Sequence, residues 1–570
     1  MRVTHGHALT AALAALNIGA SIADLVTYDW RVTSLNVEYD GVFIHSLGIN
    51  DKPADQAVID VELGQDVEVR VTNELEEPTC LHWHGLKQLG TQEMDGTSEI
   101  TQCHISPNST AIYRFTPDKA GTFWWHSHHK AQYAYGLRGP LVVHAPANER
   151  QDWEKDIDGE FVIQMADLYH RPPQPTRMWD NVLINNRGRY NCIAAAHHNF
   201  TECTEEQPLS KFNFVPGNKY LLRLINMAAL SPIVFSIDDH EFQVVAADGD
   251  HLQPSELINS VTLNAGQRYD IVVQAKSPSA QNQKNAFWMR ANGLHGLPWT
   301  RGTAAIAGEG YTYEGLAIIS YGSESEAEPT TTKQENLTTV SEFDFMPLVP
   351  IALPQTASDR AVLEFKMQDG LGHFAIDGGA YHHFMHPEDP PLFSIAGGLK
   401  TEQLPVEANA RKIEYGKHIE VVLVNVKDEQ HPFHMHTHSP WVVGSGVASI
   451  DQIRNNQLPA LKLLNPMTRD VYTVPPCTSD GNGGCKDAGY LVLRFNADNP
   501  GVWIFHCHID WHLEAGLSMM LVEGEEELQK KGVAAFSNSI LSVCGSNSKF
   551  HPGHNSTGNA TALTPSPPRH

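Results

Sequence analysis

Apolar and polar residues alternate in short segments along much of the chain. Residues 59–63 read Ile-Asp-Val-Glu-Leu, and residues 67–71 read Val-Glu-Val-Arg-Val. Alternation with a period of two is typical of strands that bury one face, and two such runs in succession indicate an antiparallel hairpin. Long runs with helical periodicity are scarce. The pattern therefore predicts an all-β fold class.

A turn followed by an alternating strand and an asparagine occurs three times. Each copy has a glycine, three apolar residues at every second position, and an asparagine nine residues after the glycine. The copies cover residues 64–73, 217–226 and 416–425. A turn and a strand alone occur in any β protein, but the shared asparagine favours three similar β domains.

The length and the breaker residues divide the chain. A chain of 570 residues has room for three or four domains at roughly 100–200 residues each. An Ala-Pro-Ala segment after His144 closes the first domain, and an acidic, Thr-rich segment with Pro329 is typical of a linker. We expect a signal peptide at 1–23, domains at 24–146, 147–322 and 340–545, a linker at 323–339, and a disordered tail at 546–570.

The N-terminus resembles a secretory leader. A small apolar run over 8–23 follows Arg2, and Ser21 and Ala23 suit a cleavage site. A buried core helix is the alternative. No other stretch approaches the roughly 20 apolar residues of a membrane span, and the Ser- and Pro-rich C-terminus shows no anchor signal. Secretion agrees with five glycosylation sequons, at Asn108, Asn199, Asn336, Asn555 and Asn559.

The amino-acid composition limits the classes of function that the chain can have. The 40 Lys and Arg against 66 Asp and Glu give a formal charge of -26, which argues against nucleic acid or anionic membranes as partners. The chain also has 31 histidines. Because histidine is the commonest metal ligand, this number favours a metalloprotein.

Eight of these histidines form four H-x-H pairs. The pairs are His82 and His84, His126 and His128, His434 and His436, and His506 and His508. On a strand, residues i and i+2 point to one face, roughly 7 Å apart. A single pair is more often a surface or core feature, but four pairs in one chain favour a polynuclear metal site where domains meet.

The residue inside the last pair suggests a second metal site. Cys507 lies between two histidines, so its sulfur points to the opposite face of a strand. His431 also leans away from the face of the 434–436 pair, and His512 in the following turn completes a set of one thiolate and two imidazoles. This set is the blue-copper arrangement. The H-C-H backbone would join this outer copper to an inner copper cluster, which suits electron transfer.

The segments HWHG, HSH, HPFHMHTH and HCHIDWHLEAGL resemble, in this order, the copper-binding segments of the three-domain multicopper oxidases. That family includes laccases, ascorbate oxidases and fungal-type ferroxidases. The resemblance covers the chain from about residue 30 to residue 545. It implies three consecutive cupredoxin-like Greek-key β-sandwich domains, four copper ions, one-electron oxidation of a substrate, and reduction of O2 to water by a chain that we expect to be monomeric.

The resemblance also implies a role for each ligand. It assigns His431, Cys507 and His512 to the type 1 copper, His82 and His434 to the type 2 copper, and His84, His126, His128, His436, His506 and His508 to the type 3 pair. Leu517 stands ten residues after the cysteine, where the family places an axial neighbour. Leucine cannot coordinate, so a comparatively oxidising type 1 site is expected, unlike ascorbate oxidases, whose pattern has a Met there.

Four acidic residues are candidates for proton handling. Asp95 and Asp510 match acidic positions that the family places beside the copper cluster, where a carboxylate can orient water and relay protons. Glu205 and Glu206 fall near the position at which laccases place an acid that accepts the phenolic proton. For each, the alternative is a solvated loop carboxylate.

The identity of the reductant is the open question. Asn213 and Lys427 stand where the ferroxidase pattern has Glu and Asp, although Asp428 is adjacent and Trp511 is the residue type that ferroxidases show. We therefore expect a laccase-like oxidase of phenols or aromatic amines. The alternatives are a ferroxidase or an oxidase of ascorbate or another small reductant. A non-catalytic copper-binding protein is disfavoured, because storage does not need Cys507 between two cluster ligands.

The remaining cysteines and histidines complete the expectations. Cys103 with Cys544 resembles the bridge that ties the first laccase domain to the C-terminus. Cys192 with Cys203, and Cys477 with Cys485, could close short loops, leaving Cys80 unpaired. Six histidines are surplus to the ligand set and are expected at the surface or beside the ligands: His129, His197, His198, His382, His383 and His438.

Overall fold

The computed structural model describes residues 24–171, 178–197, 200, 202–277, 285–294, 312–321, 328–481 and 484–552. The expected signal peptide at 1–23 lies outside these residues, as do His198 and the sequons at Asn199, Asn555 and Asn559. Among the described residues, no helix is long and apolar enough to cross a membrane.

The first part of the chain forms a sandwich of two sheets. One sheet has the strand order β3-β2-β1-β5-β7, and the other has the order β4-β9-β8-β6. The strands are β1 (Leu25–Val37), β2 (Ile44–Ile49), β3 (Lys52–Pro53), β4 (Ile59–Glu62), β5 (Asp66–Asn73), β6 (Leu81–His84), β7 (Thr110–Phe115), β8 (Gly121–Ser127) and β9 (Arg138–His144).

The second sandwich follows the same plan. Its sheets have the orders β11-β10-β13-β18-β15-β16 and β12-β20-β19-β14-β17. The strands are β10 (Gly159–Leu168), β11 (Asn181–Ile184), β12 (Ser210–Asn213), β13 (Lys219–Asn226), β14 (Ile233–Ile237), β15 (Phe242–Ala247), β16 (Asp250–His251), β17 (Ser260–Leu263), β18 (Arg268–Gln274), β19 (Ala286–Gly293) and β20 (Glu314–Ser320).

The third sandwich completes the molecule. Its sheets have the orders β23-β22-β21-β25-β30-β27, with β29 beside β30, and β24-β32-β31-β26-β28. The strands are β21 (Asp359–Gln368), β22 (Leu371–Ile376), β23 (His382–His383), β24 (Ala410–Ile413), β25 (His418–Asn425), β26 (His431–Met435), β27 (Trp441–Ala448), β28 (Val471–Val474), β29 (Thr478–Ser479), β30 (Cys485–Asn496), β31 (Gly501–Cys507) and β32 (Ser518–Glu523).

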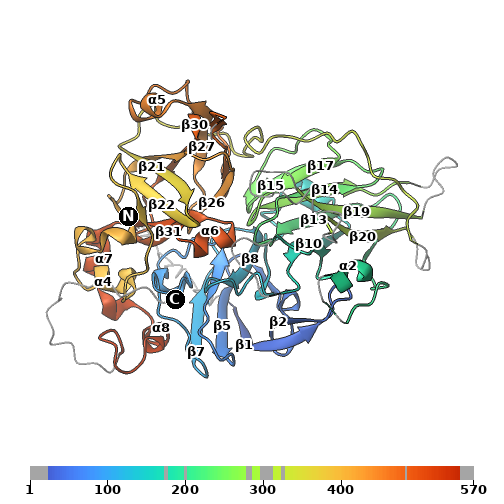
Figure 1. Ribbon diagram of the computed structural model, residues 1–570, viewed down its shortest axis with the longest axis horizontal. Helices are drawn as coiled ribbons and strands as arrows, with labels where there is room; N and C mark the ends of the chain where they lie inside the picture. The colour runs from blue at the N-terminus through green and yellow to red at the C-terminus, as the bar shows by residue number, and fades with distance from the viewer. Residues whose placement is uncertain are drawn as a thin grey trace, which may run out of the picture.

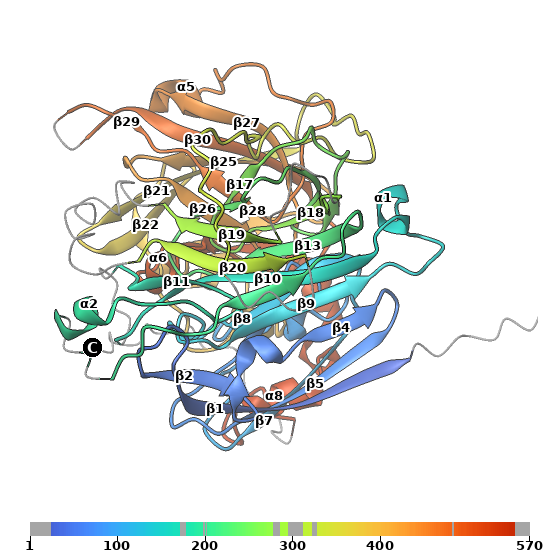
Figure 2. The same ribbon diagram turned by 90° about the vertical axis from the view of Figure 1, so that its right-hand side faces the viewer.

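Short helices lie between and after the strands. They are α1 (Asp152–Lys155), α2 (Cys192–His197), α4 (Pro391–Ala396), α5 (Ile450–Arg454), α6 (Asp510–Glu514), α7 (Glu525–Lys531) and α8 (Asn538–Val543). In Figures 1 and 2 the first sandwich, in blue, lies below the other two, and the C-terminal helix α8 lies beside β7 of the first sandwich. The all-β prediction is therefore confirmed.

The three sandwiches repeat one pairing scheme. In each, the strand that carries the repeated motif pairs in parallel with an earlier strand, as in β1–β5, β10–β13 and β21–β25. The predicted hairpin of β4 and β5 is wrong. The turn at Gly64 passes from one sheet to the other, so β4 pairs with β9 and β5 pairs with β1 and β7. Alternation identified two half-buried strands correctly but not their partners.

The repeated asparagine has the same task in every sandwich. Its side chain is fully buried at the end of the strand and bonds the backbone of the next loop. Asn226 donates from Nδ2 to the carbonyls of Ser231 and Leu263, both at 2.9 Å, and its Oδ1 accepts from Ala228 N at 2.9 Å. Asn73 makes the equivalent three bonds in the first sandwich. The motif therefore predicts a loop anchor as well as a strand.

Apolar cores run across the domain boundaries. One buried cluster joins Trp124 and Tyr133 of the first sandwich to the interiors of the second and third. A second cluster joins the first sandwich to α4, α8 and one face of β31. Because each interface is part of a core, the three sandwiches hold fixed positions relative to one another.

Three disulfides and the C-terminal segment reinforce this arrangement. Cys103–Cys544, Cys192–Cys203 and Cys477–Cys485 are all formed, as expected, and Cys80 is buried and unpaired. Beyond the first bridge, Phe550 is buried against Phe393 and Lys549 pairs with Asp389 at 2.6 Å. This part of the expected disordered tail therefore packs against the third domain.

Replacement of Asn226 by Ala tests the loop anchor. The Asn226→Ala change leaves two buried carbonyls and one buried N–H without partners, which we expect to cost about 2–4 kcal/mol of unfolding free energy. Scanning calorimetry should show the corresponding transition lowered by about 4–10 °C. The control is Asn213→Ala at the exposed end of β12, which should shift the transition little. Equal shifts in both variants would contradict the anchoring role.

Candidate metal centre

Two strands of the first sandwich present the first two histidine pairs. β6 and β8 are antiparallel neighbours, and His82 stands opposite His126. His84 ends β6, and His128 directly follows β8. Because alternate residues share a face, all four imidazoles project from one side of this sheet.

Two strands of the third sandwich present the other pairs. β26 and β31 are antiparallel, with His434 opposite His506. His436 follows the end of β26, and His508 follows the end of β31. The two sheets face each other, so four histidines of the first sandwich meet four of the third.

These eight residues form one compact set, which we call the histidine group. His84 Nδ1 lies 3.2 Å from His508 Nε2, and the same distance separates the Nε2 atoms of His436 and His506. Their ligand atoms gather into three triads, each within 4.8 Å. The triads are His82, His84 and His434; His84, His126 and His508; and His128, His436 and His506.

The chemistry of the histidine group fits metal ions. The Nε2 atoms of His82, His126, His128 and His434 are buried and have no hydrogen-bond partner. Burial, reinforced by the neighbouring imidazoles, lowers the pKa of His434 well below its ordinary value, so the ring is neutral and its nitrogen is free to bind a metal. His82 and His434, the predicted type 2 ligands, share the first triad with His84. The other two triads contain only predicted type 3 ligands, and His84 belongs to one of them as well.

A second set, which we call the Cys507 group, lies on the other side of β31. Cys507 Sγ is 3.5 Å from His431 Nδ1 and 3.6 Å from His512 Nδ1, and the two nitrogens are 3.2 Å apart. Three ligands on one ion with bonds of about 2.0 Å lie about 3.5 Å apart in trigonal geometry. The three atoms therefore have the spacing of a three-coordinate metal site.

The two faces of β31 explain why the groups are separate. Val502 and Ile504 belong to the core shared with the first sandwich, whereas Phe505 and Cys507 belong to the core of the second and third. Cys507 thus points away from the histidine group although both its neighbours belong to it. The sequence predicted this opposition from strand alternation.

The Cys507 group is buried from solvent except at one edge. Cys507, His431 and Leu517 are fully buried, whereas His512 is half-buried on α6. Burial raises the pKa of the Cys507 thiol. Leu517 O accepts from Cys507 N at 3.1 Å, which places the leucine beside the group as the sequence predicted. Solvent therefore reaches this group at His512.

Asp95 is built into the histidine group. Its Oδ2 lies 3.0 Å from His436 Nδ1 and accepts from Thr97 Oγ1 at 2.8 Å. Its backbone carbonyl lies 2.7 Å from His82 Nδ1. One buried residue therefore orients two imidazoles through their Nδ1 atoms and leaves their Nε2 atoms directed into the group.

Asp510 begins α6 between the two groups. It is buried, and its Oδ2 has no hydrogen-bond partner. Burial, together with the nearby Glu514 and Asp167, raises the pKa of Asp510 well above its usual range. These surroundings therefore favour the protonated form of the carboxyl group, which can donate a proton.

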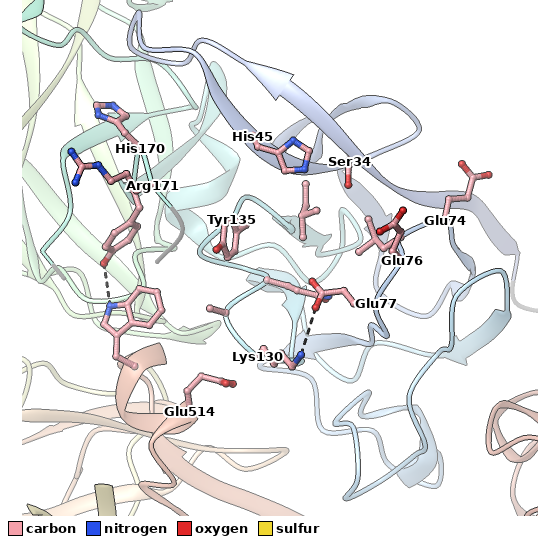
Figure 3. A pocket seen from close by; sticks show the side chains of 16 residues that line it. Ser34, His45, Glu74, Glu76, Glu77, Lys130, Tyr135, His170, Arg171 and Glu514 are labelled. Carbon is pink, nitrogen blue, oxygen red and sulfur yellow. Dashed lines mark hydrogen bonds and ion pairs between the residues drawn. The ribbon is translucent and has the colours of Figure 1, made fainter. Parts of the chain in front are cut away.

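A groove of about 1020 Å³ opens beside α6 and is lined by Trp511, Glu514, Glu77, Lys130 and Gln132 among others. Figure 3 shows Glu77 and Lys130 on one wall and Glu514 on the side of α6. Gln132 Nε2 donates to Glu77 at 3.3 Å, and Gln132 Oε1 accepts from Ser127 Oγ at 2.7 Å. Because Ser127 lies between His126 and His128, this chain of bonds links the groove to the histidine group.

Asp470 is a site residue that sequence reasoning missed. Its Oδ1 lies 3.1 Å from His84 Nε2, and its backbone carbonyl lies 3.0 Å from His434 Nδ1. Arg268 of the second sandwich holds the carboxylate with two bonds of 2.6 Å. Asp470 and His84 are separated by 386 residues, so no local motif connects them.

A buried ion network surrounds Asp470. Arg469 bonds Asp248 at 2.8 and 2.9 Å, and Asp248 also lies 3.6 Å from Arg268. Burial alone would raise the pKa of Asp248, but the two guanidinium groups outweigh it and hold the pKa below its usual range. Arg268 further donates to the carbonyl of Thr122 at 3.2 Å, so the network contacts all three sandwiches.

The remaining predicted residues lie outside both groups. Glu205 and Glu206 are exposed. Shortly before them, Cys203 forms an isolated β-bridge with Val42 of the first sandwich. In the described part of the chain they have no contact with His431 or His512, so their role stays a prediction. Among the surplus histidines, His438 is buried and pairs with Glu523 at 3.0 Å, and His382 and His383 are half-buried in β23.

Models of the multicopper oxidase family match residues 31–148, 151–323 and 384–527. The chain is 31% identical over 523 residues to Laccase-1 of Botryotinia fuckeliana, covering 87% of this chain and 82% of that protein. It is 30% identical over 526 residues to the iron transport multicopper oxidase fio1 of Schizosaccharomyces pombe, covering 88% and 76%.

A solved structure shows the same fold. The crystal structure of Fet3p, a multicopper oxidase that functions in iron import, superimposes with a TM-score of 0.77 at 24% identity. The match covers 96% of this chain and 100% of that one.

The Asp470→Asn variant tests whether Asp470 stabilises the fold and positions His84. The change keeps the shape of the side chain but removes the charge that pairs with buried Arg268, so we expect a loss of about 3–5 kcal/mol in unfolding free energy. Copper affinity of the histidine group should also fall by about 10–100-fold, because a neutral amide orients and polarises His84 less strongly than a carboxylate does. Copper retention against a chelator measures this effect.

A Glu342→Gln variant separates positioning from stability. Glu342 bonds Arg469 at 3.3 Å in the same network but is not bonded to the histidine group. It should lower thermal stability without changing copper affinity. Wild-type copper affinity in Asp470→Asn would show that Asp470 does not position His84.

Proposed function

The chain belongs to the multicopper oxidase family, and from this premise we propose that it is a laccase-like oxidase of phenols or aromatic amines. The observation that carries the proposal is the pair of groups on opposite faces of β31. One group has a solvent-facing imidazole edge, the other is buried, and Cys507 is covalently joined to His506 and His508 of the buried group. This arrangement suits entry of electrons at one site and their use at another.

Four copper ions are the proposed complement, one in the Cys507 group and three in the histidine group. The one thiolate and two imidazoles of the first group, and the unpartnered nitrogens of the second, fit that metal. Bound copper supplies the redox chemistry, in which electrons are taken singly from a reductant and delivered to O2.

The protein selects the reductant at His512. His431 and Cys507 are fully buried, so an aromatic ring reaches the group at the half-buried imidazole edge of His512. Leu517, which is buried and bonded through its backbone to Cys507, is proposed as the axial neighbour, and because leucine offers no ligand atom it favours an oxidising site. A phenol gives up a proton with its electron, and Glu206 is the carboxylate proposed to accept it.

Protons for reduction of O2 to water are proposed to come from Asp510 and Asp95. Asp510 has a buried carboxyl group whose Oδ2 has no hydrogen-bond partner, and its raised pKa favours the protonated form. Asp95 holds His82 and His436 in place and keeps its Oδ1 without a partner. The groove beside α6 is linked to the histidine group by the hydrogen bond between Gln132 and Ser127.

A ferroxidase is the second candidate function. Relatives of both kinds are similar to the chain, and Glu429 stands two residues before His431. A carboxylate near the Cys507 group suits ferrous iron, a cation that accepts oxygen ligands. Against this, Asn213 and Lys427 offer no carboxylate where the ferroxidase pattern has one.

Several circumstances of the activity are also proposals. Three disulfides agree with an oxidising compartment, and the sequons at Asn108 and Asn336 are exposed, so we propose a secreted, glycosylated enzyme with a signal peptide. We propose that it acts as a monomer, with O2 and a small aromatic reductant as its partners.

Oxygen uptake by the copper-loaded protein tests the choice of reductant. We expect kcat/KM for a methoxyphenol to exceed that for ferrous iron by about tenfold or more, equivalent to about 1.4 kcal/mol in transition-state binding. Glu429→Gln should leave the phenol value unchanged. A strong preference for ferrous iron that disappears in Glu429→Gln would contradict the laccase proposal and support a ferroxidase.

A further inference from the structure

Gln132 is a buried residue in the turn that follows β8. It is 2% exposed, and every hydrogen-bonding position of its amide has a partner. Its Oε1 accepts from the hydroxyls of Thr79 and Ser127, each at 2.7 Å. Its Nε2 donates to the carbonyl of Pro78 at 2.9 Å and to Glu77 Oε1 at 3.3 Å. A buried amide with four partners is held in one orientation.

The direction of each of these bonds follows from the chemistry of the groups. The Pro78 carbonyl can only accept, so the NH2 group of the amide must face it. The amide oxygen therefore faces the two hydroxyls, and each hydroxyl must donate to it. Ser127 Oγ then keeps a lone pair for the backbone N–H of His129, which lies 3.2 Å away. The bonds thus form one ordered chain from Pro78 to the backbone that follows His128.

One end of this chain lies in the loop that leads into β6. The carbonyl of Glu77 in this loop accepts from the repeated asparagine of the first sandwich, Asn73, at 2.9 Å. Thr79 N donates to Ile105 O at 3.1 Å. Thr79 stands three residues before His82, the first histidine of β6. The position of His82 therefore depends on a loop that Gln132 helps to hold.

The other end of the chain is the middle residue of the second histidine pair, Ser127. Its carbonyl lies 2.9 Å from His126 Nδ1, so Nε2 is the nitrogen of that imidazole left without a partner. Its N donates to Leu137 O at 3.0 Å. Its hydroxyl bonds both Gln132 and the N–H that follows His128. Every polar atom of Ser127 is thus bonded, and the backbone of His128 is held on both sides.

We propose that Gln132 is a positioning residue of the histidine group, which holds the two histidine pairs of the first sandwich in fixed positions relative to each other. This inference rests on the proposed copper complement of that group. Gln132 binds no metal itself. It acts through Ser127 and Thr79, because the partners that orient the ligands of a metal site determine how tightly the metal is bound.

Copper retention by the copper-loaded enzyme tests this role. Gln132→Leu keeps a side chain of similar size but removes the partner of the Thr79 and Ser127 hydroxyls and of the Pro78 carbonyl. We expect the copper affinity of the histidine group, measured against a chelator, to fall by about 10–100-fold. The blue absorption of the Cys507 group should stay at its wild-type value. The electron paramagnetic resonance spectrum should change, because it reports the ligand geometry of copper(II).

Ser127→Ala is the second variant. It removes only the hydroxyl that bonds Gln132, so it remains measurable if Gln132→Leu does not fold. Copper affinity should fall in the same direction. The double variant should bind copper no more weakly than Gln132→Leu alone, because both changes remove the same bond.

Gln102→Leu is the matched control. Gln102 is also fully buried in the first sandwich, and its Nε2 donates to Cys103 O at 2.9 Å. Among the described residues, its side chain makes no hydrogen bond to the histidine pairs. The same substitution at this position should lower the melting temperature but leave copper affinity and the paramagnetic spectrum at wild-type values.

Two results would overturn the inference alone. One is wild-type copper affinity in both Gln132→Leu and Ser127→Ala, and the other is an equal loss of affinity in Gln102→Leu. A wild-type protein that binds no copper in the histidine group would contradict the proposed function, and the inference with it.

Discussion

The fully buried ion network of Asp248, Arg268, Arg469 and Asp470 is the constraint on which the arrangement of the molecule depends. The histidine group is divided between the first and third sandwiches, so it exists only if these domains keep a fixed relation. Removing one charge from such a network leaves its partners uncompensated, at a cost of about 3–5 kcal/mol. Apolar packing alone tolerates small slips, whereas bidentate pairs fix direction as well as distance. The network therefore sets the position of His84 and His434 through Asp470.

The second organising feature is the alternation of side chains along β31. On one face of β31, Cys507 supplies the sulfur of the Cys507 group. On the opposite face, at the end of the strand, His506 and His508 supply imidazoles of the histidine group. The separation keeps a solvent-facing edge at His512 apart from a buried interior, yet joins the two through the covalent chain. The proposed function needs both properties, because it assigns the reductant and O2 to different groups. The same strand packs into a different apolar core on each of its two faces.

The sequence predicted site residues correctly where these residues lie a few positions apart on one strand. The H-x-H pairs, the opposed Cys507 and the repeated asparagine each depend on strand periodicity, and the structure places them as that periodicity requires. Residues brought together by topology gave no such signal. Asp470 and Arg268, for example, lie 202 residues apart. The pairing of β4 and β5 failed for the same reason, because alternation reports burial and not the neighbouring strand. Glu206 remains a prediction, because an exposed loop has no periodic pattern to align.

The central claim is that electrons enter at the Cys507 group and reach the histidine group through the H-C-H segment. A Cys507→Ser variant tests it most directly, with copper content, blue absorption and oxygen uptake measured on one preparation. We expect a folded protein that keeps copper in the histidine group, loses the blue absorption, and shows no phenol-dependent oxygen uptake above background. Oxygen uptake at the wild-type rate in that variant would contradict it.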